Sequence, residues 1–334
     1  MTKGELRSLA ASVVLTGFAQ AQPGPELDAL LDAYPFAGFI FFDRNSATLR
    51  ELRSLTDRLR SRYRETPPIL SIDQEGGRVM RLRDGVAPMP SAAEIGARND
   101  EGYAERIGAQ CAADLRRAGC NLDFAPVLDL AVDPRNTVIG SRSFGADPLA
   151  VTRLARAFAR GLERGGVIAT YKHFPGHGAT SVDSHLALPV IEVDEATLRA
   201  RDLVPFAAVA REAHAMMSAH VVVPAFDPGL PGTLSARILK GLLRDEFGFG
   251  GVCFSDCLHM KAIADGVGSV EGGLLAMRAG CDVLTVSHDP NLAVAIADRL
   301  VRAVEQGDLR IERLREAAAR VAALRARLQP ALAA

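Results

Sequence analysis

The sequence has no tryptophan, and aromatic residues make up only 5% of its 334 residues. Broad surfaces that bind long ligands by stacking rings on aromatic side chains are therefore not expected. Blocks of like charge are missing too, because 39 basic and 40 acidic side chains are interspersed and give a net charge of −1. The charge pattern gives no reason to expect a nucleic acid or an anionic membrane as a partner.

Long hydrophobic runs are also missing. No stretch approaches the roughly 20 apolar residues that a membrane-spanning helix requires, so we expect no membrane partner. The N-terminus carries a weak secretion-signal pattern, with Lys3 and Arg7 ahead of the apolar residues 9–18 and small residues at 19–21. Glu5 interrupts the basic part of this pattern, which weakens that interpretation.

Cysteine is scarce, with five residues in the chain. The odd number and the largely apolar surroundings favour buried free thiols in a reducing compartment. Cys253 and Cys257 are separated by three residues and do not form the paired C-x-x-C spacing of a zinc site. We therefore expect no metal site built on the cysteines.

Short apolar, β-branched runs recur eight times along the chain. They are mostly continuous rather than alternating, as expected for strands buried on both faces of a parallel sheet. The runs cover residues 13–18, 38–42, 69–73, 122–127, 167–174, 215–222, 252–256 and 282–287.

Amphipathic stretches with helical periodicity separate these runs. They cover residues 47–63, 102–118, 148–164, 194–212, 235–247, 269–279, 291–305 and 311–328. The alternation predicts an α/β fold, a single (β/α)₈ barrel over residues 1–334. A doubly wound sheet is the alternative, but no G-x-G-x-x-G follows an early strand. Because a barrel needs its first strand, we expect residues 9–18 to be part of the folded structure and the protein to be cytoplasmic.

Polar residues gather where the predicted strands end. Asp73 ends the third strand, Lys172 and His173 lie at the end of the fifth, and Asp256 ends the seventh. The carboxyl ends of barrel strands share one face, and barrel enzymes carry their active sites there. The segment 174–193 has neither helical nor strand periodicity, which is typical of a functional loop.

Retaining glycoside cleavage needs a nucleophile and a group that first gives and then takes a proton. Asp256 suits the nucleophile, because a strand end fixes its position. His185 suits the proton carrier, since an unperturbed histidine titrates near pH ~6.5. Asp183, two residues earlier, is placed to orient the His185 ring and to favour its protonated form.

Together these residues resemble glycoside hydrolase family 3, and within it the bacterial β-N-acetylhexosaminidases of peptidoglycan recycling. The most specific match is Lys-His-Phe-Pro-Gly-His-Gly at 172–178, followed by Asp-Ser-His at 183–185. Further matches lie at 73–79, 124–127, 142–144, 232–235 and 247–250, so the resemblance runs from about residue 5 to residue 290.

The resemblance implies a role for each matching residue. Asp256 is then the nucleophile, and His185 is the acid/base, tuned by Asp183. The residues that would line the pocket for the terminal sugar are Asp73, Arg81, Arg142, Lys172 and His173. The implied reaction removes a terminal β-linked N-acetylglucosamine from a muropeptide or its disaccharide. We expect a small carbohydrate substrate, no cofactor or metal, and a monomer.

Two features depart from the family pattern. Cys257 stands where the family usually has a second aspartate after the nucleophile, so a carboxylate beside Asp256 is missing. The chain also ends near the barrel, without the second domain that supplies a carboxylate acid/base in many family 3 β-glucosidases. Because that carboxylate is missing, another residue must carry the proton, which strengthens the expectation that it is His185.

Simpler interpretations stay open for several residues. Asp256 also fits a helix N-cap, and Asp183 fits an ordinary turn. His177 fits a residue that holds a loop, Glu75 a turn residue, and Arg78 an ion-pair partner.

Other functions also stay open. A metal-dependent barrel hydrolase is one, with the ligands His173, His177, His185 and Asp256. An inactive sugar-binding module is another. Within the enzyme class, a β-glucosidase or a phosphate-dependent phosphorylase is the alternative, because a histidine acid/base does not repel an anionic acceptor. Elemental analysis and turnover of aryl glycosides separate these functions.

Overall fold

The computed structural model describes residues 1–334 except 22, 46–47, 64–65, 181–187 and 329–334. Eight parallel strands form one sheet in the order β11-β8-β7-β6-β3-β2-β1-β12. Their bounds are β1 (Val14–Thr16), β2 (Gly38–Phe41), β3 (Ile69–Ile72), β6 (Leu122–Asp123), β7 (Ile168–Phe174), β8 (Ala215–Ser218), β11 (Val252–Phe254) and β12 (Leu284–Val286). Each predicted run holds one of these strands, and the predicted barrel fold is confirmed.

The sheet closes into a barrel between β11 and β12, the two strands at the ends of this order. Phe254 and Val283 form a parallel bridge there. The amide of Asp282 donates to the Cys253 carbonyl at 2.7 Å, and the amide of Ser255 donates to the Val283 carbonyl at 2.8 Å. Closure leaves no open edge on the sheet and brings all eight carboxyl ends to one side.

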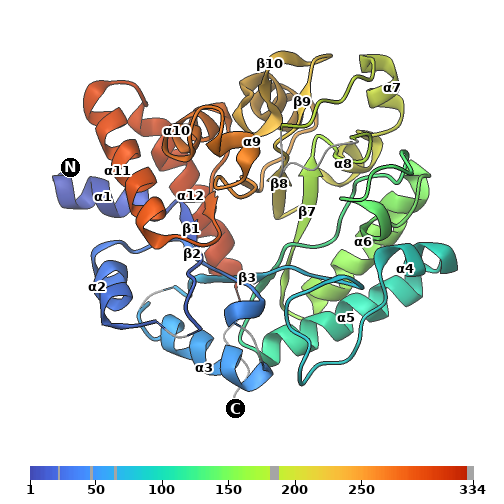
Figure 1. The fold of residues 1–334 in the computed structure, drawn as a ribbon, viewed down its shortest axis with the longest axis horizontal. Helices are drawn as coiled ribbons and strands as arrows, with labels where there is room; N and C mark the ends of the chain where they lie inside the picture. The colour runs from blue at the N-terminus through green and yellow to red at the C-terminus, as the bar shows by residue number, and fades with distance from the viewer. Residues whose placement is uncertain (22, 46–47, 64–65, 181–187, 329–334) are drawn as a thin grey trace.

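Helices surround the strands (Figure 1). Their bounds are α1 (Lys3–Ala11), α2 (Pro25–Ala33), α3 (Leu49–Arg60), α4 (Ala92–Arg98), α5 (Glu101–Arg117), α6 (Pro148–Arg164), α7 (Glu195–Ala200), α8 (Val204–Val209), α9 (Lys261–Ala264), α10 (Ser269–Ala279), α11 (Pro290–Gln306) and α12 (Ile311–Arg327). The predicted ranges 148–164 and 269–279 match α6 and α10 to the residue. Helix α6 has a clear start signal, because Asp147 accepts the amides of Leu149 and Ala150 and Pro148 occupies the first turn.

Several predicted bounds were wrong for local reasons. The single helix expected over 194–212 is two short helices, α7 and α8, separated by residues 201–203, and Pro205 in the first turn of α8 has no amide to donate back across the break. The fourth strand ends after Asp123 instead of running to 127, and Pro126 likewise lacks a ladder donor. The sixth strand ends at Ser218, because Val222–Val223 form β9 and pair with β10 (Asp227–Pro231) instead.

Some elements had not been predicted from the sequence. Helix α1 precedes the first strand and starts with a capping box between Thr2 and Glu5. A hairpin of β4 (Gln74–Gly76) and β5 (Val79–Met80) follows β3 and turns at Gly76 and Gly77, which both have positive φ angles. The stretch over 235–247 is a π-helical segment, η4 (Arg237–Glu246), after a short 3₁₀ turn, η3 (Gly232–Leu234). Two further 3₁₀ turns are η1 (Asp43–Asn45) and η2 (Gly140–Arg142).

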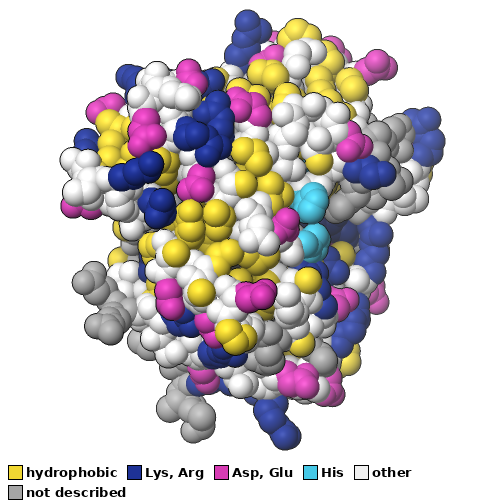
Figure 2. Space-filling model, turned by 60° about the vertical axis from the view of Figure 1, so that its left-hand side comes forward, with side chains coloured by type: hydrophobic (Ala, Val, Ile, Leu, Met, Phe, Trp, Pro, Cys, Tyr) yellow, Lys and Arg dark blue, Asp and Glu magenta, His cyan; other side chains and the backbone are white. Residues whose placement is uncertain are grey.

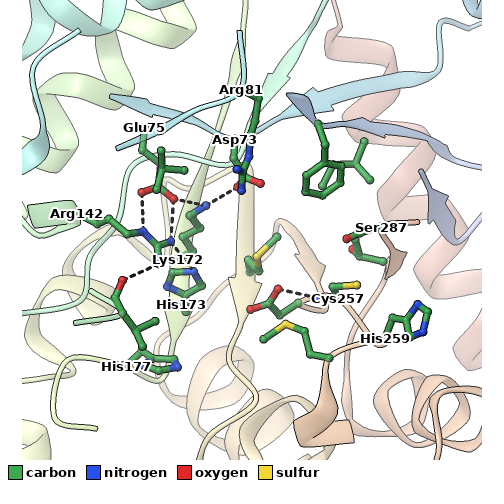
Figure 3. A pocket seen from close by; sticks show the side chains of 18 of the residues that line it. Asp73, Glu75, Arg81, Arg142, Lys172, His173, His177, Cys257, His259 and Ser287 are labelled. Carbon is green, nitrogen blue, oxygen red and sulfur yellow. Dashed lines mark hydrogen bonds and ion pairs between the residues drawn. The ribbon is translucent and has the colours of Figure 1, made fainter. Parts of the chain in front are cut away.

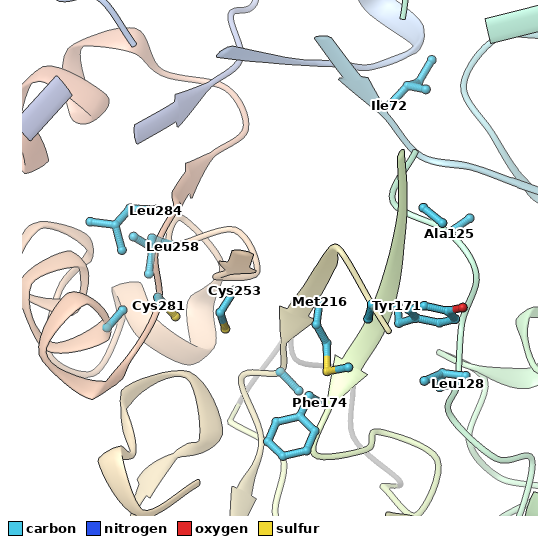
Figure 4. Close-up of a cluster of buried hydrophobic side chains, with 14 of the residues drawn as sticks. Ile72, Ala125, Leu128, Tyr171, Phe174, Met216, Cys253, Leu258, Cys281 and Leu284 are labelled. Atoms are coloured by element: carbon cyan, nitrogen blue, oxygen red, sulfur yellow. The ribbon is translucent and has the colours of Figure 1, made fainter. Parts of the chain in front are cut away.

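Apolar side chains form two buried layers. One fills the barrel, where the rings of Phe124 and Phe254 meet edge to face at 5.4 Å and α12 residues such as Leu324 close one end. The other lies between the sheet and the helices and includes Met216, Phe174 and Cys253 (Figure 4). Because the strands are buried on both faces, ionisable side chains gather near their ends, which positions the site.

Candidate active site

A cavity of about 640 Å³ opens at the carboxyl ends of the barrel strands. Its walls carry every predicted site residue that the structure describes, namely Asp73, Arg81, Arg142, Lys172, His173 and Asp256. Asp183 and His185 lie outside the described residues. Figure 3 shows the charged cluster around Lys172 on one side of the cavity and Cys257, Ser287 and His259 on the other.

Asp256 lies two residues after the end of β11. Its Oδ1 atom accepts the backbone amide of Cys257 at 2.7 Å, which holds the carboxylate close to the strand end. The preceding residue, Ser255, is buried and accepts the amide of Thr285 from β12 on its Oγ atom at 2.9 Å. The backbone that carries Asp256 is therefore tied to the neighbouring strand.

Lys172 is the centre of the opposite wall. Its side chain is only 2% exposed, and its Nζ atom lies 2.7 Å from both Asp73 Oδ1 and Glu75 Oε1. Burial alone would lower the pKa of Lys172, but these two carboxylates outweigh burial and raise it. Lys172 therefore stays charged, and it fixes the position of Asp73 at the end of β3.

Glu75 joins Lys172 to Arg142. Arg142 donates from Nε and Nη2 to the two Glu75 oxygens, both at 2.8 Å, which is a bidentate pair. Burial would raise the pKa of Glu75, but Arg142 and Lys172 outweigh burial and hold the pKa well below its usual range. The sequence suggested only a turn residue here, whereas the side chain lines the cavity between two cations.

His173 is backed by Asp129, a residue that sequence reasoning missed. Asp129 is buried, and its Oδ2 atom lies 2.6 Å from His173 Nδ1. Burial would raise the pKa of Asp129, but His173 and His177 outweigh burial and lower it. The sequence held one indication of this role, because Asp129 is a charged residue inside the apolar stretch that follows Phe124-Ala125-Pro126.

His177 lies in the same hydrogen-bonded layer. Its amide donates to Asp129 Oδ1 at 2.7 Å, and its Nδ1 atom lies 2.9 Å from the Thr180 hydroxyl. Asn136 donates to the carbonyls of His177 and Gly178 at 2.8 and 3.0 Å. Burial lowers the pKa of His177, so the ring is neutral at pH 7. These contacts fit the loop-holding role suggested by the sequence, although the ring also lines the cavity.

Arg81 lies on a third wall, beside Phe42. Its guanidinium sits 5.4 Å from the centre of the Phe42 ring and 3.8 Å from Asp43 Oδ1. Gln74 positions this segment, because its Oε1 atom accepts the amides of Arg81 and Leu82 at 3.0 and 3.1 Å. Arg78, proposed above as an ion-pair partner, donates to the backbone carbonyl of Thr137 at 2.7 Å.

Two kinds of feature are absent from the described residues. Among the described residues, no cluster of three or more His, Cys, Asp or Glu side chains is arranged to hold a metal ion. The same part of the chain contains no helix that is long and apolar enough to cross a membrane. The cavity instead combines a carboxylate on a fixed strand end with several paired hydrogen-bonding groups, an arrangement suited to holding a polyhydroxylated ligand.

Comparison with known proteins gives a consistent result. The model for the glycosyl hydrolase family 3 N terminal domain matches residues 4–324. The Beta-hexosaminidase of Idiomarina loihiensis is 37% identical over 290 residues, which cover 84% of this chain and 87% of that protein. The Beta-hexosaminidase of Pseudomonas aeruginosa is 41% identical over 270 residues, 79% of each chain.

Two solved structures are similar throughout the chain. A glycoside hydrolase family 3 beta-N-acetylglucosaminidase from Paenibacillus sp. has a TM-score of 0.95 at 39% identity, and the match covers 98% of this chain and 64% of that one. NagZ from Neisseria gonorrhoeae, solved in complex with N-trifluoroacetyl-D-glucosamine, has a TM-score of 0.78 at 34% identity, covering 94% of this chain and 98% of that one.

Proposed function

The chain belongs to glycosyl hydrolase family 3, and from this premise we propose that it is a retaining exo-β-N-acetylglucosaminidase. It removes a terminal β-linked N-acetylglucosamine from short cell-wall fragments in the cytoplasm. The names of its relatives support the sugar, since two are beta-hexosaminidases and one is a beta-N-acetylglucosaminidase. The bound N-trifluoroacetyl-D-glucosamine in the gonococcal structure is a further support.

One observation carries the proposal: Asp256 and the Lys172 cluster line the same cavity. A strand-end carboxylate on one wall is available to attack an anomeric carbon. Asp73, Lys172 and Arg142 on the other walls offer acceptors and donors for sugar hydroxyls. Because Glu75 pairs both cations before any ligand arrives, these groups keep their geometry and need little reorganisation on binding.

The proposed reaction has two steps. In the first, an Asp256 oxygen forms a bond to the anomeric carbon, and the bond to the leaving-group oxygen breaks as that oxygen takes a proton from His185. In the second, His185 takes a proton from water, the water oxygen attacks the anomeric carbon, and Asp256 is released. Asp183 would orient His185. The roles of Asp183 and His185 rest on the sequence alone.

The first test compares an aryl β-N-acetylglucosaminide with the matching aryl β-glucoside. We expect the N-acetyl substrate to be preferred, whereas preference for the glucoside would assign a β-glucosidase. Replacing Asp256 with Ala is expected to lower kcat/KM by at least about 10³-fold, because the covalent step is lost. Full activity of Asp256→Ala would exclude the proposed nucleophile.

The covalent intermediate can be examined directly. Enzyme quenched in acid during turnover should carry one added N-acetylhexosamine on the peptide that contains Asp256, as measured by mass spectrometry. The Asp256→Asn variant is the matched control and should carry no such adduct. An adduct on another residue would reassign the nucleophile.

Replacing His185 with Ala tests the proton carrier. Activity should fall strongly on substrates with poor leaving groups, and much less on activated aryl glycosides, because an activated leaving group needs no proton. Equal losses on both kinds of substrate would contradict the acid role.

The natural substrate and the acceptor need a separate assay. We expect a purified muropeptide to yield free N-acetylglucosamine, with the same amount of product in phosphate-free and phosphate-containing buffer. Formation of N-acetylglucosamine 1-phosphate would assign a phosphorylase instead.

A further inference from the structure

Asp129 lies directly behind His173, with each of its carboxylate oxygens bound to different groups. The Oδ2 atom lies 2.6 Å from His173 Nδ1 and accepts the His173 amide at 3.2 Å. The Oδ1 atom accepts the amide of His177 at 2.7 Å. With both oxygens accepting backbone N–H groups in a buried site, this carboxylate acts as an acceptor, so the His173 nitrogen facing it must be the donor.

Arg142 constrains the other ring nitrogen. Its Nη2 atom lies 3.3 Å from His173 Nε2. A guanidinium has donors and no acceptor, so a proton on His173 Nε2 would face another donor. Because Glu75 holds the Arg142 fork by two hydrogen bonds at 2.8 Å, the guanidinium cannot easily turn away. The two neighbours of His173 therefore favour the same arrangement, with the proton on Nδ1 and a lone pair on Nε2.

We infer that Asp129 is a positioning residue that fixes His173 in its Nδ1–H tautomer, so that Nε2 accepts a hydrogen bond in the cavity. The Nε2 lone pair already faces Arg142 Nη2 at 3.3 Å, so a ligand group that His173 recognises must be a donor that shares or replaces this long contact. Only the identity of that donor as a sugar hydroxyl rests on the proposed function, whereas the tautomer does not.

The backbone around Asp129 explains why this geometry is fixed. The amide of Leu128 donates to the Lys172 carbonyl at 2.6 Å, and Val127 forms a parallel bridge with Lys172. These bonds extend the pairing of β6 with β7 past Pro126 and set Asp129 beside His173.

The Asp129→Asn variant replaces one of the two carboxylate oxygens with an NH₂ group, so only one position can still accept a hydrogen bond. If the amide oxygen keeps the His177 contact, the NH₂ group faces His173 Nδ1, and the ring proton must move to Nε2, where it meets Arg142. The opposite placement leaves the His177 amide without its acceptor. We expect kcat/KM to fall by about 10- to 100-fold, mainly through a higher KM, because a charge-assisted contact behind a ligand-binding ring is lost.

The decisive readout is the tautomer itself. The ¹⁵N chemical shifts of ring-labelled histidines should show the Nδ1–H form for His173 in the resting protein, and the Nε2–H form in Asp129→Asn only where the NH₂ group faces the ring. The chain has seven histidines, and a His173→Gln variant identifies the signal. An Nε2–H or doubly protonated His173 in the unmodified protein at pH 7.5 would overturn the inference, even if Asp129→Asn did not fold.

Asn136→Ala is the matched control. It removes buried hydrogen bonds to the carbonyls of His177 and Gly178, to the Thr180 hydroxyl and from the Ile139 amide, and none of these bonds involves His173. We expect lower stability with an unchanged His173 tautomer. A changed tautomer in this control would reduce Asp129 to a purely structural role. Failure to cleave any N-acetylglucosaminide would refute the proposed function and leave the tautomer result intact.

Discussion

At the residue scale, Asp123 is a carboxyl group whose pKa is raised by burial. It is fully buried, its Oδ1 atom accepts the Gln74 amide at 2.9 Å, and Cys111 lies 3.5 Å from Oδ2. Burial and the Asp73 carboxylate raise the pKa of Asp123 to about 7, against the opposing effects of the Gln74 amide and Lys172. An unfolded chain would release this proton near pH ~3.9.

This difference predicts a pH dependence of stability. Between about pH 4 and pH 7 the folded state binds a proton that the unfolded state has released, so the free energy of unfolding falls as the pH rises through this range. The slope from this group should reach about 1 kcal/mol per pH unit. Asp123→Asn cannot titrate, and its urea-unfolding free energy should fall less between pH 5 and pH 8 than that of the unmodified protein.

A control keeps that measurement specific. Asp245 is 59% exposed and bonds Lys240 on the surface, so Asp245→Asn should leave the pH dependence of unfolding unchanged. Parallel curves for Asp123→Asn and the unmodified protein would show that Asp123 is ionised in the folded state.

The cavity wall shows how far single residues could be interpreted from the sequence. Asp73, Lys172 and Asp256 were predictable because strand ends and a specific motif marked them. Glu75 and Asp129 were not, since their importance comes from partners about 67 and 44 positions away along the chain, at Arg142 and His173. Only folding brings those pairs together.

At the element scale, α5 and α6 pack backbone against backbone through glycine. A Cβ atom added at Gly161 would lie 2.1 Å from the Glu105 carbonyl oxygen, and one added at Gly108 would lie 2.1 Å from the Phe158 carbonyl oxygen. The two helices approach this closely because neither position carries a side chain.

Gly161→Ala is therefore expected to destabilise the protein by about 1–3 kcal/mol, despite the better helix propensity of alanine. Gly241 is a matched control inside another helical segment, because its added Cβ would come no closer than 4.0 Å to a neighbour, the Ala236 carbonyl oxygen. Gly241→Ala should be neutral or stabilising by up to about 1 kcal/mol. Equal effects of the two substitutions, measured by urea unfolding, would contradict close packing as the cause.

Element type was easier to predict than element end. Periodicity identified α6 and α10 because each has one buried face over several turns. It could not locate the break at residues 201–203 between α7 and α8, because the apolar pattern continues across it. Short elements such as α4 and β5 span too few residues for a period to be recognised.

At the scale of the whole molecule, Asp282 helps to hold the barrel closed. It is fully buried at the start of the β12 segment, and its carboxylate accepts Arg313 at 3.0 Å, Arg320 at 3.2 Å and also Arg244. The same carboxylate accepts the Cys253 amide from β11 at 3.0 Å. One acidic group therefore links α12, η4 and both strands of the closing seam.

Asp282→Asn should lower the free energy of unfolding by about 2–3 kcal/mol, because it removes the buried anion that three part-buried guanidinium groups share, although Glu316 still pairs Arg313 and Arg320. Urea unfolding at pH 7 is the measurement, with Asp245→Asn as the exposed control, expected to change stability by less than about 1 kcal/mol. A small effect at Asp282 would mean that hydrogen bonds between β11 and β12 close the barrel on their own.

The fold as a whole was predictable because eight separate runs had to agree on one architecture. The number of strands implied that the barrel closes, but it did not show how. The contact between β11 and β12 depends on Phe254, Val283 and the hydrogen bonds of Asp282. The surface carries less information of this kind, and Figure 2 shows apolar, basic and acidic side chains mixed on the visible face.

The placement of the cysteines means that the number of thiols labelled by a reagent reports whether the protein is folded. Cys111, Cys120, Cys253 and Cys281 are buried, and Cys257 alone is partly accessible, on the cavity wall. Burial raises the pKa of Cys257, so a thiol reagent should label a native molecule slowly and only once. An unfolded chain should react at all five cysteines. A ligand bound in the cavity should protect Cys257 from the reagent in the folded protein. In a chain without tryptophan, the same label count would follow both unfolding and occupancy of the cavity.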